Sequence, residues 1–301
     1  MIGTSWRREQ GLKDPLLVEV MHKHGLTTVP LYENASPERT RYDAEIKRMG
    51  ALRDGPLNPT RVPVSDLVQM TEEVKTRARD FGADLVGIAR LRPTHIDLDV
   101  DLTHEYVIAI GVHEDYEAVL EGPRAVETEA HKAYYMVASI ATQLSAHIRD
   151  LGYPALAHHN GGTNIQAIPA LYDAGFGELG KHGSLINPTY GASFRPSFVS
   201  TNLPLQVDQP YEFGVQVYCD SCRLCVNNCP GDAIPQEFTV TEGIKRWLTN
   251  IEKCYPYSRL RTEYCHLCVD VCPYNAPNHK STYRAFMAGR KTEGYKSPKH
   301  Q

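Results

Sequence analysis

The sequence predicts an α+β protein, in which a body of alternating helices and strands precedes a compact cysteine-rich module. Two observations lead to this prediction. From residue 64 onward the apolar residues change repeatedly between helical and strand spacing. All eight cysteines then lie between residues 219 and 272. We therefore expect an N-terminal arm (residues 1–60), a ligand-binding body (61–210) and a cysteine-rich module with a C-terminal tail (211–301).

The composition of the 301-residue chain is that of an ordinary globular protein, with 42% hydrophobic and 23% charged residues. The formal net charge of −4 argues against nucleic-acid binding driven by bulk charge. No apolar run approaches the roughly 20 residues that a membrane-spanning helix needs. Arg7 and Arg8 could indicate export, but no apolar segment follows them, so we expect a cytoplasmic protein without a cleavable signal.

The elements of the arm and the body can be assigned in chain order. The arm is rich in proline, arginine and glutamate, and we expect it to be irregular except for a short amphipathic segment at residues 15–22. In the body, Ser65 is placed to cap a helix and Gly82 to end it. The regular elements expected in the body are a helix over 65–81, strands over 84–90 and 106–112, and a helix over 127–150.

The long helix over 127–150 has an apolar face at helical spacing. The residues on this face are Val137, Ile140, Leu144, Ile148 and Leu151. At about 100° per residue, Tyr134 lies beside the inward face and Tyr135 points nearly opposite. A buried tyrosine in a cleft can act as a general acid, although most tyrosines at such positions pack with a hydrogen-bonded hydroxyl. Spacing alone leaves both roles open for Tyr134.

A polar loop and a glycine-rich block follow the long helix. His158 and His159 are adjacent, and adjacent side chains rarely reach one metal ion, so we expect a solvated or hydrogen-bonding loop. The block at residues 175–191 is dense in glycine. Glycine lets the backbone approach a large flat or phosphate-bearing group closely.

The cysteines form two runs with the spacing of bacterial 4Fe-4S proteins. The first run is Cys219-x2-Cys222-x2-Cys225-x3-Cys229-Pro, and the second is Cys254 followed by Cys265-x2-Cys268-x3-Cys272-Pro. In such pairs the fourth cysteine of a run ligates the other cluster. We therefore assign one 4Fe-4S cluster to Cys219, Cys222, Cys225 and Cys272, and the other to Cys229, Cys254, Cys265 and Cys268. Two structural zinc sites are the alternative, but zinc requires neither three cysteines at two-residue intervals nor a proline after each fourth cysteine.

In combination, these motifs resemble the cobalamin-dependent reductive dehalogenase family and its relative, epoxyqueuosine reductase. The segments that carry the resemblance are residues 82–91, 148–155 and 173–191, together with both cysteine runs. The resemblance implies a nitroreductase-like α/β domain that holds base-off cobalamin, followed by a ferredoxin-like domain with two 4Fe-4S clusters. It also implies the two-electron removal of halide from a small organohalide, with electrons from a separate ferredoxin, flavodoxin or reductase.

The same resemblance implies roles for individual residues. Tyr134 resembles the proton-donating tyrosine of the family, Arg195 an arginine that supports it, and Asn160 or Asn164 a polar residue near the substrate. A neighbouring guanidinium would favour the phenolate and make proton donation easier near neutral pH. The residues expected to contact cobalamin are Gly175, Gly177, Gly180, Lys181, Gly183, Leu185 and Asn187.

Two other functions stay open at this point. An epoxyqueuosine reductase acting on tRNA would use the same two cofactors, with a basic tRNA-facing patch and an acidic proton donor. A non-catalytic iron–sulfur electron carrier, or a corrinoid-binding accessory protein, would belong to a different functional class. A carrier would not need the glycine-rich pocket.

Overall fold

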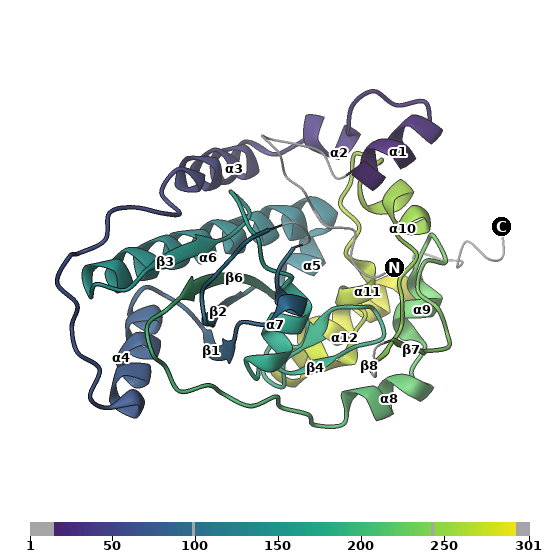
Figure 1. Cartoon of the computed structure of the whole chain (residues 1–301). Helices are drawn as coiled ribbons and strands as arrows, with labels where there is room; N and C mark the ends of the chain where they lie inside the picture. Colours follow the sequence, from purple (N-terminus) through teal and green to yellow (C-terminus); the bar gives the residue numbers. More distant parts are fainter. Residues whose placement is uncertain (1–14, 98–99, 242–243, 293–301) are drawn as a thin grey trace.

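The structure, a computed structural model, describes residues 15–97, 100–241 and 244–292 (Figure 1). Arg7 and Arg8, on which the expectation about export rests, lie outside the described residues. Within the described part of the chain, no helix combines the length and the apolar character that crossing a membrane requires.

The centre of the molecule is a four-stranded sheet in the order β1-β2-β6-β3, with every neighbouring pair antiparallel. Its strands are β1 (Leu85–Arg90), β2 (Tyr106–His113), β3 (Ala155–His158) and β6 (Phe194–Thr201). The strands predicted at residues 84–90 and 106–112 are thus confirmed. All of β2 except its last residue is buried, because alternate side chains point into two different layers of helices.

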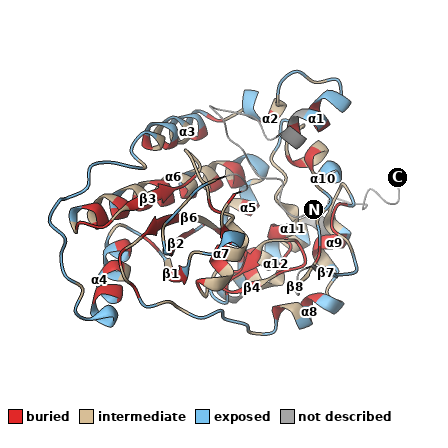
Figure 2. Cartoon of the chain, in the orientation of Figure 1, coloured by how far each residue is buried: buried red, intermediate tan, exposed pale blue. Residues whose placement is uncertain are grey.

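Helices cover both faces of this sheet, as the buried residues in Figure 2 show. The covering helices are α4 (Leu67–Asp80), α6 (Pro123–Asp150) and α7 (Ala167–Asp173). Ile108 and Ile110 of β2 pack in one core with α4 and α6, whereas Val107 and Ala109 pack in a second core with α7. The predicted mixture of helices and sheet is confirmed, and the sheet is antiparallel.

Two helix starts differ from the prediction. The N-cap of α4 is Asp66 rather than Ser65, and its Oδ1 accepts the backbone N–H groups of Val68 (2.8 Å) and Gln69 (3.1 Å). Serine and aspartate are both favourable N-caps, so the residue types alone could not distinguish the two neighbours. α6 begins at Pro123, before the predicted start, because proline is well suited to the first turn of a helix.

In its described part, residues 15–60, the N-terminal arm contains three helices, so the prediction of an irregular arm was wrong there. It contains α1 (Pro15–Lys23), α2 (Pro30–Glu33) and α3 (Pro37–Gly50), of which only α1 was expected. Ser36 caps α3 by accepting the N–H of Arg39 at 3.1 Å. α3 was missed because few of its residues are apolar, and it buries only a narrow stripe.

α3 lies along α6 in the folded chain (Figure 1). Ile46 and Met49 of α3 form a buried cluster with Ala138 of α6, and both Tyr134 and Tyr135 pack against this cluster. The expectation that Tyr135 points away from the apolar face therefore describes α6 alone. In the folded protein α3 covers that side, and Tyr135 is half-buried.

The cysteine-rich module is built from short elements. They are α8 (Val215–Ser221), α9 (Leu224–Asn228), β7 (Thr239–Thr241), β8 (Ile244–Arg246), α10 (Ile251–Ser258), α11 (Leu267–Asp270), η2 (Pro273–Asn275) and α12 (Ala276–Thr292). The remaining elements of the body are η1 (Pro93–His95), α5 (Ala118–Glu121), β4 (Glu178–Leu179) and β5 (Leu185–Ile186). α1 packs on α10, where Leu17 and Val20 meet Tyr255, so the arm contacts the module as well as the body.

Candidate active site and cysteine-rich module

Arg195 of β6 is the centre of the candidate active site. Its side chain is 15% exposed and forms an ion pair with Glu114, with 2.8 Å between Nε and Oε1. Its Nη1 donates to the hydroxyl of Tyr134 at 3.3 Å, and the guanidinium carbon lies 5.1 Å from the centre of the tyrosine ring. The structure thus brings together the two residues that the sequence suggested as proton donor and supporting arginine.

Two residues of the cysteine-rich module complete the contacts of Arg195. Its Nη2 donates to the hydroxyl of Tyr264 at 3.4 Å and lies 3.2 Å from His266 Nε2. Tyr264 and His266 flank Cys265 in the sequence, and their rings stack with centroids 5.6 Å apart. One guanidinium therefore connects Tyr134 with the loop that carries a predicted cluster ligand.

The surroundings of Arg195 favour its charged form. Burial opposes the charge, but Glu114, followed by Tyr134 and Tyr264, raises the pKa of Arg195 well above its ordinary value. Burial also raises the pKa of Tyr264, an effect that Arg195 and Arg259 partly offset. Arg195 is therefore a permanent cation and hydrogen-bond donor beside Tyr134, and it does not itself release a proton.

The structure distinguishes the two candidate asparagines. Asn164 Oδ1 accepts a hydrogen bond from Arg53 Nη2 at 2.8 Å, and the Asn164 N–H donates to His158 Nδ1 at 3.2 Å. These contacts tie Asn164 to the edge strand of the sheet. Asn160 lies in the turn that follows β3, and its role near a substrate stays a prediction.

His158 is a structural residue. It is fully buried, and its Nε2 lies 2.8 Å from Ser200 Oγ on the neighbouring strand. Burial, followed by the charge of Arg53, lowers the pKa of His158 well below its ordinary value. The expectation of a solvated or hydrogen-bonding loop is thus met by hydrogen bonding at His158.

The glycine-rich block forms the β4–β5 hairpin, and its closest approaches are to the chain itself. A Cβ atom at Gly177 would lie 2.0 Å from the Ile186 carbonyl oxygen, and one at Gly180 would lie 2.6 Å from the Ile186 side chain. A Cβ at Gly175 would lie 2.7 Å from the Gln209 carbonyl oxygen. Packing within the chain therefore accounts for these glycines, and their contact with cobalamin stays a prediction.

Other predicted cobalamin contacts also have partners within the chain. Leu185 belongs to the core beneath α7. Asn187 Oδ1 accepts the N–H groups of Thr189 (2.9 Å) and Tyr190 (3.2 Å), so this side chain closes a turn. At Gly183, φ is +85°, a conformation that side chains rarely adopt. Roles toward a corrin for these three positions stay predictions.

Lys181 contacts the cysteine-rich module. It is 2% exposed, and its Nζ donates to the Cys222 carbonyl at 2.9 Å and the Asp220 carbonyl at 3.4 Å. Its backbone N–H donates to Cys219 Sγ at 3.4 Å. The ammonium of Lys181 is therefore hydrogen-bonded to backbone carbonyls of the first cysteine run. Its expected contact with cobalamin stays a prediction.

Four thiols from both cysteine runs line one cavity. They belong to Cys219, Cys222, Cys225 and Cys272, the set that the sequence assigned to one cluster. Burial, followed by neighbouring thiols, raises the pKa of Cys225 to about 12, so its thiolate requires the charge of a metal. His182 lines the same cavity, and its buried Nε2 has no partner among the described residues. The donor set and this free nitrogen fit a bound iron–sulfur cluster.

The cysteines of the second set lie close enough to influence one another. Burial raises the pKa of Cys265 to about 11, and Cys254 and Cys229 add to that effect. Cys225 and Cys268 share one apolar cluster, so the two sets adjoin. Among the described residues, no three His, Cys, Asp or Glu side chains are grouped as ligands of a single metal ion.

Glu178 joins the glycine-rich hairpin to the cysteine-rich module. Its carboxylate, 6% exposed, accepts four successive N–H groups at the start of α8, the helix that carries Cys219. These donors belong to Phe213 (2.8 Å), Gly214 (2.9 Å), Val215 (2.9 Å) and Gln216 (3.0 Å). Burial favours the neutral acid, but the four hydrogen bonds prevail and lower the pKa of Glu178.

We predict that Glu178→Gln lowers the free energy of unfolding by about 2 kcal/mol at pH 7, because it removes charge-assisted hydrogen bonds. A carboxyl group with a lowered pKa in the folded state stabilises above its unfolded pKa, about 4.3, and this contribution is lost as the pH falls through the folded value. Denaturant titrations between pH 3 and 7 should show a weaker acid dependence in the variant. Equal acid dependence in both proteins would contradict the assignment.

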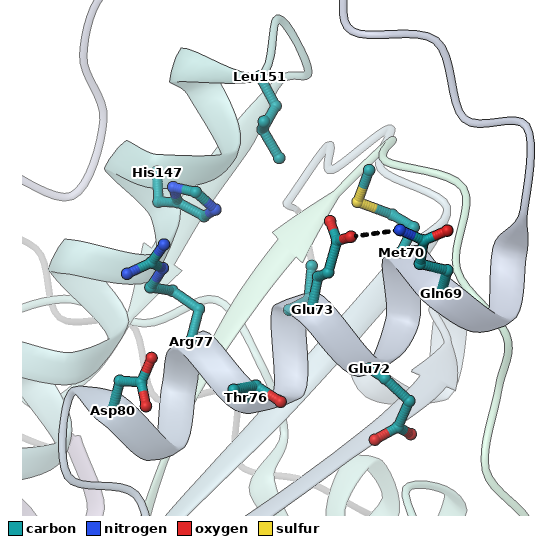
Figure 3. Close-up of a pocket in the computed structure, with 10 residues that line it drawn as sticks. Gln69, Met70, Glu72, Glu73, Thr76, Arg77, Asp80, His147 and Leu151 are labelled. Atoms are coloured by element: carbon teal, nitrogen blue, oxygen red, sulfur yellow. Dashed lines mark hydrogen bonds between the residues drawn. The ribbon is translucent and has the colours of Figure 1, made fainter.

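Another cavity lies away from Arg195. It is an open groove of about 440 Å³ between α4 and the end of α6, lined by residues that include Glu73, Arg77 and His147 (Figure 3). His147 follows Tyr134 by 13 positions along α6, which corresponds to about 20 Å. No predicted site residue lines the groove, so its size alone does not make it the active site.

Sequence reasoning missed several neighbours of Tyr134 and Arg195. Glu114 directly follows β2 and meets Arg195 because Val112 pairs with Arg195 across the sheet. His131 lies one turn before Tyr134, with its Nδ1 2.6 Å from Asp43 of the arm and its ring centre 6.0 Å from that of Tyr134. The position of Tyr264 and His266 beside a cysteine was the only local signal for these contacts.

Comparisons with known proteins agree with this geometry. The family described as 4Fe-4S dicluster domain matches residues 218–276. Tetrachloroethene reductive dehalogenase of Sulfurospirillum multivorans is 30% identical over 262 residues, which cover 71% of this chain and 52% of that protein. Epoxyqueuosine reductase of a Synechococcus species is 27% identical over 269 residues, covering 80% of this chain and 78% of that protein.

Solved structures extend the similarity to the fold. A catabolic reductive dehalogenase superposes with a TM-score of 0.76 at 28% identity, covering 83% of this chain and 38% of that one. Another solved reductive dehalogenase structure, described as suggesting a mechanism for B12-dependent dehalogenation, superposes with a TM-score of 0.73 at 28% identity. The chain thus spans about half the length of the first of these curated relatives and less of the solved structures. By sequence and by fold, this chain is a homologue of the reductive dehalogenases and is also related to epoxyqueuosine reductase.

Proposed function

We propose that this chain catalyses the reductive removal of halide from a small organohalide. In the reaction the carbon–halogen bond breaks, a carbon–hydrogen bond forms, and halide leaves as two electrons and one proton are consumed. The observation that carries the proposal is the position of Arg195. It holds the hydroxyl of Tyr134 on one side and contacts the loop of Cys265 on the other, so a proton donor and an electron path converge on one guanidinium.

The residues of the chain would divide the proton chemistry among them. Tyr134 would donate the proton to carbon, and Arg195 would stabilise the phenolate that remains by charge and by the hydrogen bond from Nη1. Glu114 would hold the guanidinium in place through its ion pair. The buried Glu114 Oε2 lacks a hydrogen-bond partner among the described residues, so an acceptor remains for a bound donor group.

Two cofactors belong to the proposal. Two 4Fe-4S clusters, supported by the dicluster family match and by the gathered thiols, would relay electrons from a separate ferredoxin, flavodoxin or reductase. Cobalamin is supported by the solved structure described with B12-dependent dehalogenation, and our proposal has it bound base-off. When bound it would supply a strongly reducing metal centre for cleavage of the carbon–halogen bond. The domain limits at residues 60 and 210 stay part of the proposal.

The assignment of the cysteines to clusters predicts a difference between two double variants. The double variant Cys219→Ser with Cys272→Ser removes two ligands of the same cluster. The four irons of the other cluster, about half of the total, should therefore remain. The double variant Cys219→Ser with Cys229→Ser removes one ligand from each cluster, so most of the iron should be lost. Iron analysis after anaerobic reconstitution measures this. The reverse pattern would show that each run ligates its own cluster.

The function itself is tested by anaerobic expression with cobalamin, metal analysis and an assay of halide release. We expect about eight irons and one cobalt per chain, with halide released in proportion to the dehalogenated product when a chemical reductant is supplied. A fully loaded protein that releases no halide from any of a panel of aryl and alkenyl halides would overturn the proposal. Iron without cobalt would instead indicate the electron carrier, and restored queuosine synthesis in a reductase-deficient strain would indicate the tRNA enzyme.

A further inference from the structure

Lys181 is a buried cation, 2% exposed. Its ammonium is engaged by two backbone carbonyls, those of Cys222 and Asp220, and lies 5.4 Å from the centre of the Trp247 ring. Among the residues that the structure describes, no carboxylate forms an ion pair with Lys181. A buried ammonium is costly unless a negative charge compensates it, and neutral carbonyls compensate only in part.

The compensating charge is available in the adjacent cavity. Lys181 lines the cavity formed by Cys219, Cys222, Cys225 and Cys272, and its backbone N–H donates to Cys219 Sγ. Four thiolate ligands would make a bound cluster anionic. The nearby carboxylate of Glu178 is committed to four N–H groups at the start of α8, so it does not serve Lys181.

We propose that the ammonium of Lys181 raises the reduction potential of the iron–sulfur cluster held by Cys219, Cys222, Cys225 and Cys272. This inference rests on the cluster assignment in the proposed function. Reduction adds one negative charge to the cluster, and a fixed neighbouring cation stabilises the more negative state. The other cluster has a carboxylate nearby instead, since Asp270 lies on the same short helix α11 as Cys268, with its Oδ1 2.9 Å from His266 Nδ1. The two clusters should therefore differ in potential, with the first accepting an electron more readily.

Lys181→Gln tests the inference, because glutamine removes the charge while its amide can still donate to the Cys222 carbonyl. The sample is the full chain reconstituted with iron and sulfide, without corrinoid, and the readout is a redox titration of the reduced clusters by electron paramagnetic resonance. At a fixed applied potential, we expect the ratio of reduced to oxidised first cluster to fall about tenfold, which corresponds to 59 mV for one electron. The second cluster should change by less than about threefold.

Lys245→Gln is a matched control. Lys245 also lies against Trp247, at 5.3 Å from the ring centre, but it is paired with Asp220 at 2.6 Å and is 26% exposed. Asp220 compensates this charge and solvent partly screens it. Its removal should therefore change the ratio of reduced to oxidised form of either cluster by less than about threefold. Lys181→Arg retains the buried charge, and it should likewise stay within threefold of the wild type.

Unchanged potentials in Lys181→Gln would overturn the inference, as would equal shifts in Lys181→Gln and Lys245→Gln. If Lys181→Gln does not assemble its clusters, Lys181→Arg decides: a tenfold shift with the charge retained would overturn electrostatic tuning, and an unshifted potential would support it. The titration uses neither corrinoid nor organohalide. If the potentials do not shift, the proposal of dehalogenation is therefore unaffected. If the protein does not dehalogenate, the measured potentials can still be interpreted.

Discussion

Tyr134→Phe should lower the turnover of an organohalide by about 10²- to 10⁴-fold while leaving iron and cobalt contents at wild-type levels. The substitution removes the hydroxyl that Arg195 holds at 3.3 Å and leaves the aromatic ring in its packing against α3. Because the ring stays, binding of the cofactors and substrate should be largely preserved. The measurement is halide release at saturating reductant, normalised to the cobalt content of each preparation.

Tyr135→Phe provides the matched control for this experiment. Tyr135 is the next residue on α6, is also half-buried, and packs on Tyr42 of the arm with ring centres 5.6 Å apart. Its loss of a hydroxyl should change turnover by less than about twofold. Wild-type turnover in Tyr134→Phe would remove Tyr134 as proton donor. Equal losses in both variants would point to disturbed packing between α3 and α6.

Glu127→Gln should lower the free energy of unfolding by about 3–5 kcal/mol, the cost of breaking a buried ion pair from one side. Glu127 of α6 pairs with Arg39 of α3, and both side chains are only 4% exposed. Arg39 also donates to the carbonyl of Leu31 in α2 at 3.0 Å. This arginine therefore connects two helices of the arm, α2 and α3, to α6 of the body. In the variant its buried charge would keep only Asp43 as a carboxylate partner, at 3.4 Å and 43% exposed. Equilibrium denaturation of the iron-loaded chain, followed by circular dichroism, gives the change.

Glu45→Gln is the corresponding surface variant. Glu45 pairs with Arg48 on the same helix, but both side chains are exposed, so we expect a cost below about 1 kcal/mol. Replacing both Arg39 and Glu127 by leucine should recover part of the stability lost in Glu127→Gln, because no unpaired charge then remains buried. If Glu127→Gln costs no more than Glu45→Gln, the buried pair does not fasten the arm.

The arm packs against the candidate site, so a loss of stability in the arm should also affect that site. Ile46 and Met49 of α3 pack against Tyr134, and Asp43 contacts His131 one turn away. An arm that detaches would uncover the proposed proton donor on that side. We therefore expect the rate of halide release by Glu127→Gln to fall at a lower temperature than that of the wild type. The loss of activity should accompany unfolding of the arm.

Features that depend on local spacing could be predicted from the sequence. The apolar run at residues 106–112 identified a strand, and the cysteine spacing identified the iron–sulfur module. Helix α6 was predicted because its apolar residues recur at helical intervals over many turns. The pairing of Cys272 with the first run was also predictable, since the run pattern itself carries that information.

Features that depend on contacts between distant segments required the structure. α3 has few apolar residues, and its helix is stabilised by packing on α6 and by the Arg39–Glu127 pair, residues 88 positions apart. The contact of Lys181 with cobalamin stays a prediction, and only the structure showed that its ammonium donates to the carbonyl of Cys222, 41 positions later. Arg195 contacts Glu114, Tyr134 and Tyr264, which come from three separate segments of the chain. The sequence by itself determined the elements and the cysteine module, because periodicity and spacing are local properties. Only the tertiary structure decided which charges meet, because a buried charge is positioned by partners that folding brings from elsewhere in the chain.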